Sequence, residues 1–413
     1  MFKYLIGIFL LLLLCTSCHV GRFFVYNFAN ITDHKIFPAT EVDPGDGETF
    51  RFPVSANASL DTLTIRVNGE RTGLTNYLDK ETSTKAFLVI HRDSIIYERY
   101  FEGHRPSDIA TVFSVSKSIT SLLTGIAVDE GKIESVNDPV TKYIPELLEG
   151  DPLFQKLTIR HLLDMRSGLD YKESYTNPFA NMARLYYGRN QLKQLSKLSF
   201  NQAPGTYKNY QSGTTAILGI AVERAVGMDL GQYLEAKVWQ PMGMEFPASF
   251  SLDDKKHRSA KGYSGVNATA RDLAKIGQLY ADGGKWRGQQ IVSAEWVKAS
   301  VTPDMGNDGY QYQWYSNTEI LLDEENKTRY FPDSMAAVAA ADTMTAAYVS
   351  ARPSQQYPGK FYVRSASRAF HAKGILNQFI YVDPDKELVI VRQGRKWDGG
   401  WYSLFGVIGE SLE

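Results

Sequence analysis

The sequence predicts an α+β fold in which an antiparallel sheet is flanked by helices and interrupted by a mostly helical subdomain. Residues 87–100 and 375–392 have the turn-separated apolar pattern of two β-hairpins, whereas the signals between about 130 and 255 are mostly helical. Strands at both ends with helices between them are typical of a sheet assembled around a helical insertion. The length of 413 residues suits one large domain over 81–413 after an N-terminal extension over 19–80.

Each hairpin is marked by a turn of strand-breaking residues. In the first, Phe87–Ile90 and Ser94–Tyr100 are separated by three polar residues. In the second, Ile375–Val382 and Leu388–Arg392 flank Asp383–Lys386, which contains a proline between two aspartates. These turns set the predicted ends of the strands.

The helices are predicted from apolar residues at helical spacing and from the residues that stop them. One helix begins at Ser114 and ends before Gly131. Another begins with the capping-box-like pair Thr269 and Asp272 and ends at Gly283. Further helices are expected over residues 157–165, 215–226 and 230–240. The alanine-rich segment at about 316–360 is expected to form a lid or rim, or to be disordered.

The composition excludes several classes of function. The net charge is −1 and 22% of the residues are charged, so no basic surface is predicted for nucleic acid. The seven histidines include no His-Glu-x-x-His pair, and the chain has neither a P-loop nor a Gly-x-Ser-x-Gly elbow. We therefore expect no metal ion, no organic cofactor and no α/β-hydrolase fold.

The N-terminus has the pattern of an exported protein. Lys3 precedes an apolar run over residues 5–14 that is short for a membrane span and suits a signal-peptide core. The Cys-Thr-Ser-Cys sequence that follows resembles the lipobox of bacterial lipoproteins, which implies a signal peptide over 1–18 and acylation of Cys18. The protein would then be anchored in the membrane of the bacterial cell envelope and face the periplasm or exterior. An ordinary cleaved signal and an uncleaved anchor are the alternatives.

The cysteine count adds a restriction. Cys15 and Cys18 are the only two cysteines, and both lie in this N-terminal segment. The mature protein would therefore have no disulfide, no thiolate nucleophile and no cysteine metal ligand. Any nucleophile must come from another residue type.

Ser114 and Lys117 are the leading candidates for chemistry. Residues three apart on a helix share a face, so the hydroxyl and the ammonium come within mutual reach. A neutral hydroxyl must lose its proton as it attacks, and a lysine whose charge is disfavoured by burial can accept that proton. The start of the helix adds N–H groups and a dipole that favour an oxyanion. This pattern predicts a serine hydrolase.

Two further segments are candidates to complete the site. Tyr210 is a candidate proton shuttle, because a nearby lysine ammonium would favour its phenolate and bring its pKa towards a useful range. Gly374 enters a predicted strand where the backbone would approach a substrate closely, and the N–H of Ile375 would face that of Ser114 as a second oxyanion donor. An ordinary core tyrosine and solvated strand residues are the alternative interpretations.

The three segments together, Ser114 to Lys117, Tyr210 to Ser212 and His371 to Gly374, resemble the motifs of the serine β-lactamase and penicillin-binding-protein superfamily. The resemblance covers roughly residues 85–410. It is closer to the branch of AmpC-like β-lactamases, esterases and 6-aminohexanoate-dimer hydrolase, in which the second motif begins with tyrosine. It implies a β-lactamase/transpeptidase-like fold.

The same resemblance assigns expected roles to individual residues. Ser114 would be the acylated nucleophile, Lys117 its proton-relay partner and Tyr210 the general base or acid. The oxyanion would be held by the backbone N–H groups of Ser114 and Ile375. The expected substrate-binding residues are Ser212, Asn267, His371, Lys373 and Gly374.

Two departures from the family pattern bear on the substrate. Ser212 stands where many relatives have asparagine, and Ala372 stands where a cation begins the third motif. In penicillin-recognising members that cation helps to hold the substrate carboxylate, so its absence argues against efficient β-lactam turnover. His371 or Lys373 would have to replace it, although alternation along a strand sends adjacent side chains to opposite faces.

The leading hypothesis is a serine hydrolase that cleaves a small ester, amide or peptide through an acyl-enzyme on Ser114. The first alternative is a penicillin-binding D-Ala-D-Ala peptidase or β-lactamase. The second is a catalytically silent homologue that binds ligands. The sequence predicts contact with a membrane through the lipid anchor, predicts no nucleic-acid partner and does not specify the oligomeric state.

Overall fold

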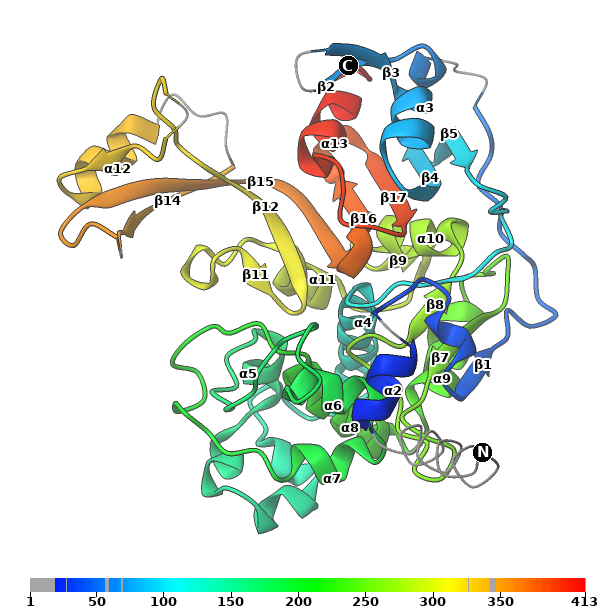
Figure 1. Cartoon of the computed structure of the whole chain (residues 1–413), viewed down its shortest axis with the longest axis vertical. Coiled ribbons are helices and arrows are strands. Elements are labelled where there is room, and N and C mark those ends of the chain that lie inside the picture. The colour runs from blue at the N-terminus through cyan, green and yellow to red at the C-terminus, as the bar shows by residue number, and fades with distance from the viewer. Residues whose placement is uncertain are drawn as a thin grey trace, which may run out of the picture.

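Strands from both ends of the chain form the main sheet of the computed structural model, with helices on both of its faces (Figure 1). The structure describes residues 19–26, 28–55, 59–67, 70–325, 327–341, 347–354 and 356–412. The helices are α2 (His19–Tyr26), α3 (Leu74–Asn76), α4 (Val115–Asp129), α5 (Ile159–Leu163), α6 (Asn181–Tyr187), α7 (Gln191–Leu195), α8 (Ser212–Val226), α9 (Leu230–Leu234), α10 (Ala270–Ala281), α11 (Ala294–Val301), α12 (Ser334–Ala340) and α13 (Trp401–Glu410).

The strands are short except in the main sheet. They are β1 (Ala39–Val42), β2 (Thr64–Val67), β3 (Glu70–Gly73), β4 (Thr84–His91), β5 (Ser94–Tyr100), β6 (Ala110–Thr111), β7 (Ala248–Ser251), β8 (Val266–Ala268), β9 (Lys285–Trp286), β10 (Gln289–Gln290), β11 (Tyr310–Gln311), β12 (Trp314–Ile320), β13 (Tyr330–Phe331), β14 (Tyr348–Pro353), β15 (Phe361–Gly374), β16 (Gln378–Asp383) and β17 (Leu388–Gly394).

The strand order confirms the predicted α+β class. The nine-stranded sheet runs β11-β12-β15-β16-β17-β4-β5, and β13 and β14 also pair with β15. β4 lies antiparallel beside β17, so the N-terminal hairpin β4-β5 and the C-terminal hairpin β16-β17 are joined in one sheet. The second hairpin begins later than predicted, because residues 375–377 form a 3₁₀ turn in which Leu376 has a φ of 62°.

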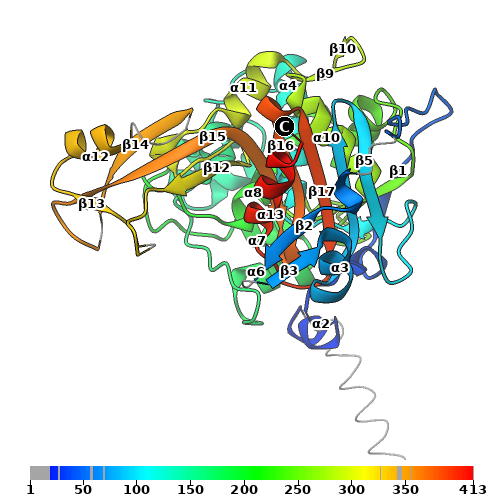
Figure 2. The same ribbon diagram turned by 90° about the horizontal axis from the view of Figure 1, so that it is seen from above.

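Alternation along β4 divides the apolar residues between two cores. Leu88 and Ile90 face a large core shared with α4, α10 and the helical subdomain, whereas Phe87 and Val89 face a smaller core shared with α13. The sheet is therefore covered on both faces, and burial of apolar side chains on each face stabilises its position. Figure 2 shows α13 and α4 at different depths of this layered arrangement.

The helical subdomain lies between the two hairpins in sequence, as predicted. It contains α5 to α9 and lies below the main sheet in Figure 1. A second sheet, β1-β7-β8-β6, adjoins it. β1 pairs with β7 over Ala39–Val42, and Asp33 accepts a hydrogen bond of 2.6 Å from the Tyr186 hydroxyl of α6. The described part of residues 19–80 is therefore built into the fold.

Residues 318–366 form an arm that extends from the body of the molecule in Figures 1 and 2. β12 and β14 pair with the long strand β15, and α12 packs on them around a small apolar cluster of Phe331, Ala337 and Val363. None of the described residues over 316–360 lines the pocket that contains Ser114. The segment builds its own sheet extension, and the expectation of a lid or rim finds no support in its described residues.

The predicted signal peptide, including Cys18, lies outside the described residues. Over the residues that are described, no helix has both the length and the apolar character that a membrane span requires. The first described element, α2, begins directly after Cys18.

Candidate active site

Ser114 lies at the start of α4 in a strained turn. Val115, Ile119 and Leu122 recur at helical spacing and are buried in the large core, which fixes the position of the helix. Phe113, directly before the serine, has a φ of 49°, in the left-handed region that residues other than glycine rarely adopt. Both Phe113 and Ser114 line the same pocket. The turn therefore places the hydroxyl in the cavity at the N-terminal end of the helix.

Lys117 places its ammonium group between three oxygen atoms. Its Nζ donates to Ser114 Oγ at 3.0 Å, to Ser212 Oγ at 3.2 Å and to the carbonyl oxygen of Tyr263 at 2.9 Å. These acceptors match the three N–H bonds of an ammonium group. The side chain is only 1% exposed. The predicted juxtaposition of Ser114 and Lys117 is present.

Burial changes the proton affinity of this lysine. It lowers the pKa of Lys117 to about 8, while the Glu173 carboxylate acts in the opposite direction. A neutral amine is therefore populated close to neutral pH, and its nitrogen lies within proton-transfer distance of Ser114 Oγ. The expectation that burial disfavours the lysine charge is confirmed.

Tyr210 lies beside Lys117, with the ammonium nitrogen 5.0 Å from the centre of its ring. Burial, followed by the neighbouring phenols of Tyr315 and Tyr310, raises the pKa of Tyr210 well above its usual value, and a hydrogen bond with Ser114 acts in the opposite direction. The prediction of a stabilised phenolate is therefore wrong for the resting site. The ammonium contacts the ring face, and the aromatic surroundings disfavour an anion. Tyr210 is therefore a neutral phenol that is hydrogen-bonded to Ser114.

Glu173 belongs to the site although sequence reasoning missed it. Ser212, at the start of α8, donates its backbone N–H to Glu173 at 2.8 Å and its hydroxyl at 2.7 Å. The Tyr175 hydroxyl donates to the same carboxylate at 2.7 Å. Ser212 lines the pocket as predicted, but its hydroxyl is held between Glu173 and Lys117. Glu173 lies outside helices and strands, so no periodic signal marks it.

Gly374 permits a close backbone contact, as predicted, but the neighbour is the protein's own chain. A Cβ atom on Gly374 would lie 2.3 Å from the carbonyl oxygen of Val112. The missing side chain lets the end of β15 lie against the segment that leads to Ser114. Ile375 follows directly and lines the same pocket as Ser114. Gly374 therefore acts through the backbone, and the oxyanion role of the Ile375 N–H stays a prediction.

His371 and Lys373 are not among the described residues that line the pocket with Ser114. They pair with Tyr381 and Phe379 of β16, whose side chains belong to the smaller core beneath α13. His371 Nε2 lies 3.0 Å from the Tyr402 hydroxyl, and burial lowers the pKa of His371 to about 3. Lys373 Nζ lies 5.4 Å from the ring centre of Phe379. His371 also stacks on Tyr315 at 5.3 Å, and Lys373 Nζ lies 5.9 Å from the ring centre of Trp397, which lines the pocket. The expectation that these two residues bind substrate stays a prediction.

Asn267 also lies apart from the pocket. It is fully buried in β8, where its amide nitrogen donates to oxygen atoms of Ser249, Ser251 and Gly265. Its carbonyl oxygen accepts a hydrogen bond of 2.7 Å from Thr111. The side chain joins the strands of the second sheet, and its hydrogen-bonding groups are already engaged. The structure therefore does not bring Asn267 into the pocket with Ser114.

Asp253, Asp254 and His257 are the group with metal-ligand spacing among the residues that the structure describes, with ligand atoms within 4.8 Å of one another. Asp254 accepts hydrogen bonds from the backbone of Asn190 and Lys256 and lies 2.7 Å from His257 Nδ1. These bonds account for the cluster as part of a loop. None of the three residues lines the pocket with Ser114.

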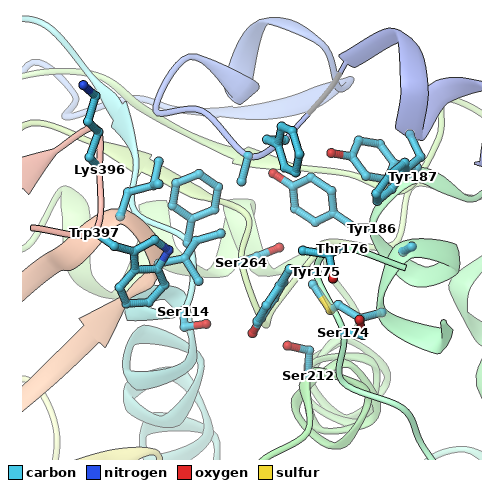
Figure 3. Close-up of a pocket in the computed structure, with 18 of the residues that line it drawn as sticks. Ser114, Ser174, Tyr175, Thr176, Tyr186, Tyr187, Ser212, Ser264, Lys396 and Trp397 are labelled. Carbon is cyan, nitrogen blue, oxygen red and sulfur yellow. The ribbon is translucent and has the colours of Figure 1, made fainter. Parts of the chain in front are cut away.

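The pocket beside Ser114 has a volume of about 450 Å³ and is lined mostly by apolar side chains. In Figure 3 the hydroxyl groups of Ser114 and Ser212 point toward one another, with the Tyr175 hydroxyl between them. Residues of the N-terminal segment, α6 and the loop after β17 contribute to the walls of the pocket. The apolar lining residues include Phe23, Phe28, Met182, Tyr187, Leu376 and Trp397. The reactive groups are therefore gathered at one end of an apolar cavity.

A serine at a helix start, a buried lysine of lowered pKa at its hydroxyl, and the two-sided antiparallel sheet define a serine hydrolase of the β-lactamase/transpeptidase-like class. The chain belongs to the beta-lactamase family, whose model matches residues 75–398.

Comparison with individual proteins places the chain among several kinds of hydrolase. It is 30% identical to 6-aminohexanoate-dimer hydrolase of Paenarthrobacter ureafaciens over 276 residues, which is 64% of this chain and 67% of that protein. It is 32% identical to esterase EstB of Burkholderia gladioli over 179 residues, 38% of this chain and 44% of that protein. A structure from Bacillus anthracis assigned as a 6-aminohexanoate-dimer hydrolase has a TM-score of 0.70 at 23% identity and covers 92% of this chain and 91% of its own.

Proposed function

We propose that this serine hydrolase cleaves an ester or a linear amide through an acyl-enzyme on Ser114. The observation that carries the proposal is the distance of 3.0 Å between Ser114 Oγ and the nitrogen of a buried lysine whose pKa is lowered to about 8. A neutral amine at this position can remove the serine proton as the oxygen attacks a carbonyl carbon. The similarity to an amide hydrolase and to an esterase supports both substrate types.

In the acylation half-reaction, neutral Lys117 takes the proton of Ser114 while Oγ forms a bond to the carbonyl carbon. The backbone N–H groups of Ser114 and Ile375 donate to the resulting oxyanion. The Tyr210 hydroxyl, which is bonded to Ser114, gives its proton to the leaving alcohol or amine as the scissile bond breaks. The products are the acyl-enzyme, a lysine ammonium and a tyrosine phenolate.

In the deacylation half-reaction, the phenolate of Tyr210 takes a proton from water, and the resulting hydroxide attacks the acyl carbon. The bond to Ser114 Oγ breaks, and the ammonium of Lys117 returns its proton to that oxygen. Tyr210 therefore needs its phenolate only while Lys117 is charged, which agrees with a neutral phenol in the resting site. All protons are restored at the end of the cycle.

A β-lactam or a D-Ala-D-Ala peptide is the second candidate substrate, supported by membership of the beta-lactamase family. Its carboxylate would require a cation, and no cation of the third motif lines the pocket, because Ala372 is buried in the core and Lys373 Nζ lies over the rings of Tyr402 and Trp397. We therefore rank an ester or amide without such a carboxylate above a β-lactam or a D-Ala-D-Ala peptide as the substrate.

A substrate panel tests this ranking. Protein lacking residues 1–18 is expected to hydrolyse p-nitrophenyl acetate or a linear amide without a carboxylate with at least about tenfold higher kcat/KM than nitrocefin or a D-Ala-D-Ala peptide, a difference within the range that one missing polar contact produces. Preference for nitrocefin would reverse the ranking. Absence of turnover and of labelling throughout the panel would favour the catalytically silent homologue.

We also propose that the protein is held at a bacterial membrane by a lipid on Cys18, as the lipobox-like sequence over residues 15–18 indicates. Cys18→Ala is expected to move the protein from the membrane fraction to the soluble fraction of lysed cells, because acylation at this position would be lost. Unchanged retention in the membrane fraction would contradict the proposal.

A further inference from the structure

We propose that the pocket beside Ser114 binds an apolar chain of the ester or amide substrate, and that α2 forms one wall of this chain-binding site. The inference rests on the proposed function, since it names the substrate class of the same site. It assigns a binding role to a segment that precedes the matched family region of residues 75–398.

The chemical character of the walls carries the first step. Phe113, Ile375 and Leu376 enclose the pocket on the side of the main sheet, and Met182 encloses it from α6. The hydroxyl groups of Ser114, Ser212 and Tyr175 lie close together at one end (Figure 3). A cavity of about 450 Å³ with apolar walls and polar groups at one end fits a molecule with an apolar chain and a reactive carbonyl at its head.

Arg395 and Lys396, the two cations at the edge of the pocket, do not change the apolar character of its walls. Arg395 lies 3.7 Å from the Glu102 carboxylate, which compensates its charge. In Figure 3, Lys396 points away from Ser114 and from the interior of the pocket. No charged side chain is therefore directed at the apolar walls among the described lining residues.

The packing of α2 carries the second step. Phe23 is 7% exposed, lines the pocket and meets the Tyr187 ring edge to face at 5.6 Å. Phe24, the next residue, is 65% exposed and is not a lining residue. Phe28 and Trp397 line the pocket yet are 59% and 61% exposed, which places apolar surface at its opening. The helix thus closes the pocket with one aromatic ring.

Two chain-length series test the substrate class. In the first, the acyl part of p-nitrophenyl esters is lengthened from acetate to octanoate; in the second, the alcohol part of acetate esters is lengthened from ethyl to octyl. Each methylene group buried in an apolar pocket improves binding on the order of threefold. We expect kcat/KM to rise at least about tenfold in one series, which also identifies the part of the substrate in the pocket. Two flat series would overturn the inference.

A matched pair of variants tests the role of α2. Phe23→Ala is expected to lower the octanoate-to-acetate ratio of kcat/KM, or the octyl-to-ethyl ratio, by at least about threefold, whereas Phe24→Ala leaves it unchanged. The ratio does not depend on the fraction of folded enzyme. If Phe23→Ala does not fold, Phe23→Trp, which fills the pocket from α2 itself, must lower the ratio. Equal ratios in the wall variant and in Phe24→Ala would exclude α2 from the site.

A binding measurement separates this inference from the proposed function. Ser114→Ala is expected to bind 1-octanol in calorimetry with a negative change in heat capacity, the signature of apolar burial. Octanol binding without turnover of any ester would overturn the proposed function and leave the pocket assignment. Turnover of acetate esters, with kcat/KM independent of chain length in both series and no octanol binding, would overturn the pocket assignment and leave the proposed function.

Discussion

Ser114→Ala is expected to abolish covalent labelling by a fluorophosphonate probe and to lower kcat for p-nitrophenyl acetate by about 10⁴-fold or more. The variant removes the only atom that forms a bond with the substrate, and the other members of such a unit cannot compensate. The fold should survive, because the Ser114 hydroxyl contacts Lys117 and Tyr210 and supports no element of the core. Intact-protein mass spectrometry and peptide mapping of the adduct measure the result.

Ser264→Ala is the matched control for this experiment. Ser264 lines the same pocket but forms no hydrogen bond with Lys117 among those of the described residues. It should therefore still be labelled, with the adduct at Ser114. Persistent labelling of Ser114→Ala, or an adduct that maps to Ser264, would remove Ser114 from the role of nucleophile.

Lys117→Met is expected to lower kcat by several powers of ten, because no other amine lies within reach of Ser114 Oγ among the described contacts. Lys117→Arg should be almost as inactive. A guanidinium group keeps a positive charge in the pocket but cannot lose its proton in the accessible pH range. An active arginine variant would mean that the charge matters and that the lysine is not the base.

The pH dependence of kcat/KM is expected to report the protonation state of Lys117. Below its pKa of about 8, Lys117 is protonated and cannot accept the serine proton, so the rate should rise about tenfold per pH unit and level off above pH 8. Removing the Glu173 carboxylate disfavours the ammonium form and lowers the lysine pKa. Glu173→Gln should therefore move the midpoint to lower pH; an unchanged or higher midpoint would show that the profile belongs to another group.

Local patterns were sufficient to predict the reactive pair and most of the scaffold. Ser114 and Lys117 are three residues apart on one helix, so helical geometry alone brings them together. The two hairpins carry turn residues at their tips, and Thr269 caps α10 by accepting a hydrogen bond from Asp272 N–H as its spacing indicated. These features depend on residues close in sequence.

The errors arose where the direction of a side chain depends on distant segments. Tyr210 lies near the lysine charge as expected, but burial and the phenols of Tyr315 and Tyr310, which are distant in sequence, raise its pKa. His371 and Lys373 follow the predicted alternation, yet only the pairing with β16 shows which face is turned to α13. Glu173 reaches Ser212 across 39 positions in sequence, and no local pattern could connect them.

With Cys18 as the proposed first residue of the mature chain, α2 would make the beginning of that chain a part of the binding site. Phe23 follows Cys18 by five residues, four of them helical steps of about 1.5 Å, so the pocket wall lies within roughly 10 Å of the proposed point of lipid attachment. A lipid there would hold the opening at the bilayer surface, and an apolar chain could pass from membrane to Ser114 without a transit through bulk water. N-terminal processing would then be a step in assembling the enzyme. A chain trimmed beyond residue 28 would keep every reactive group and lose a side of its binding site.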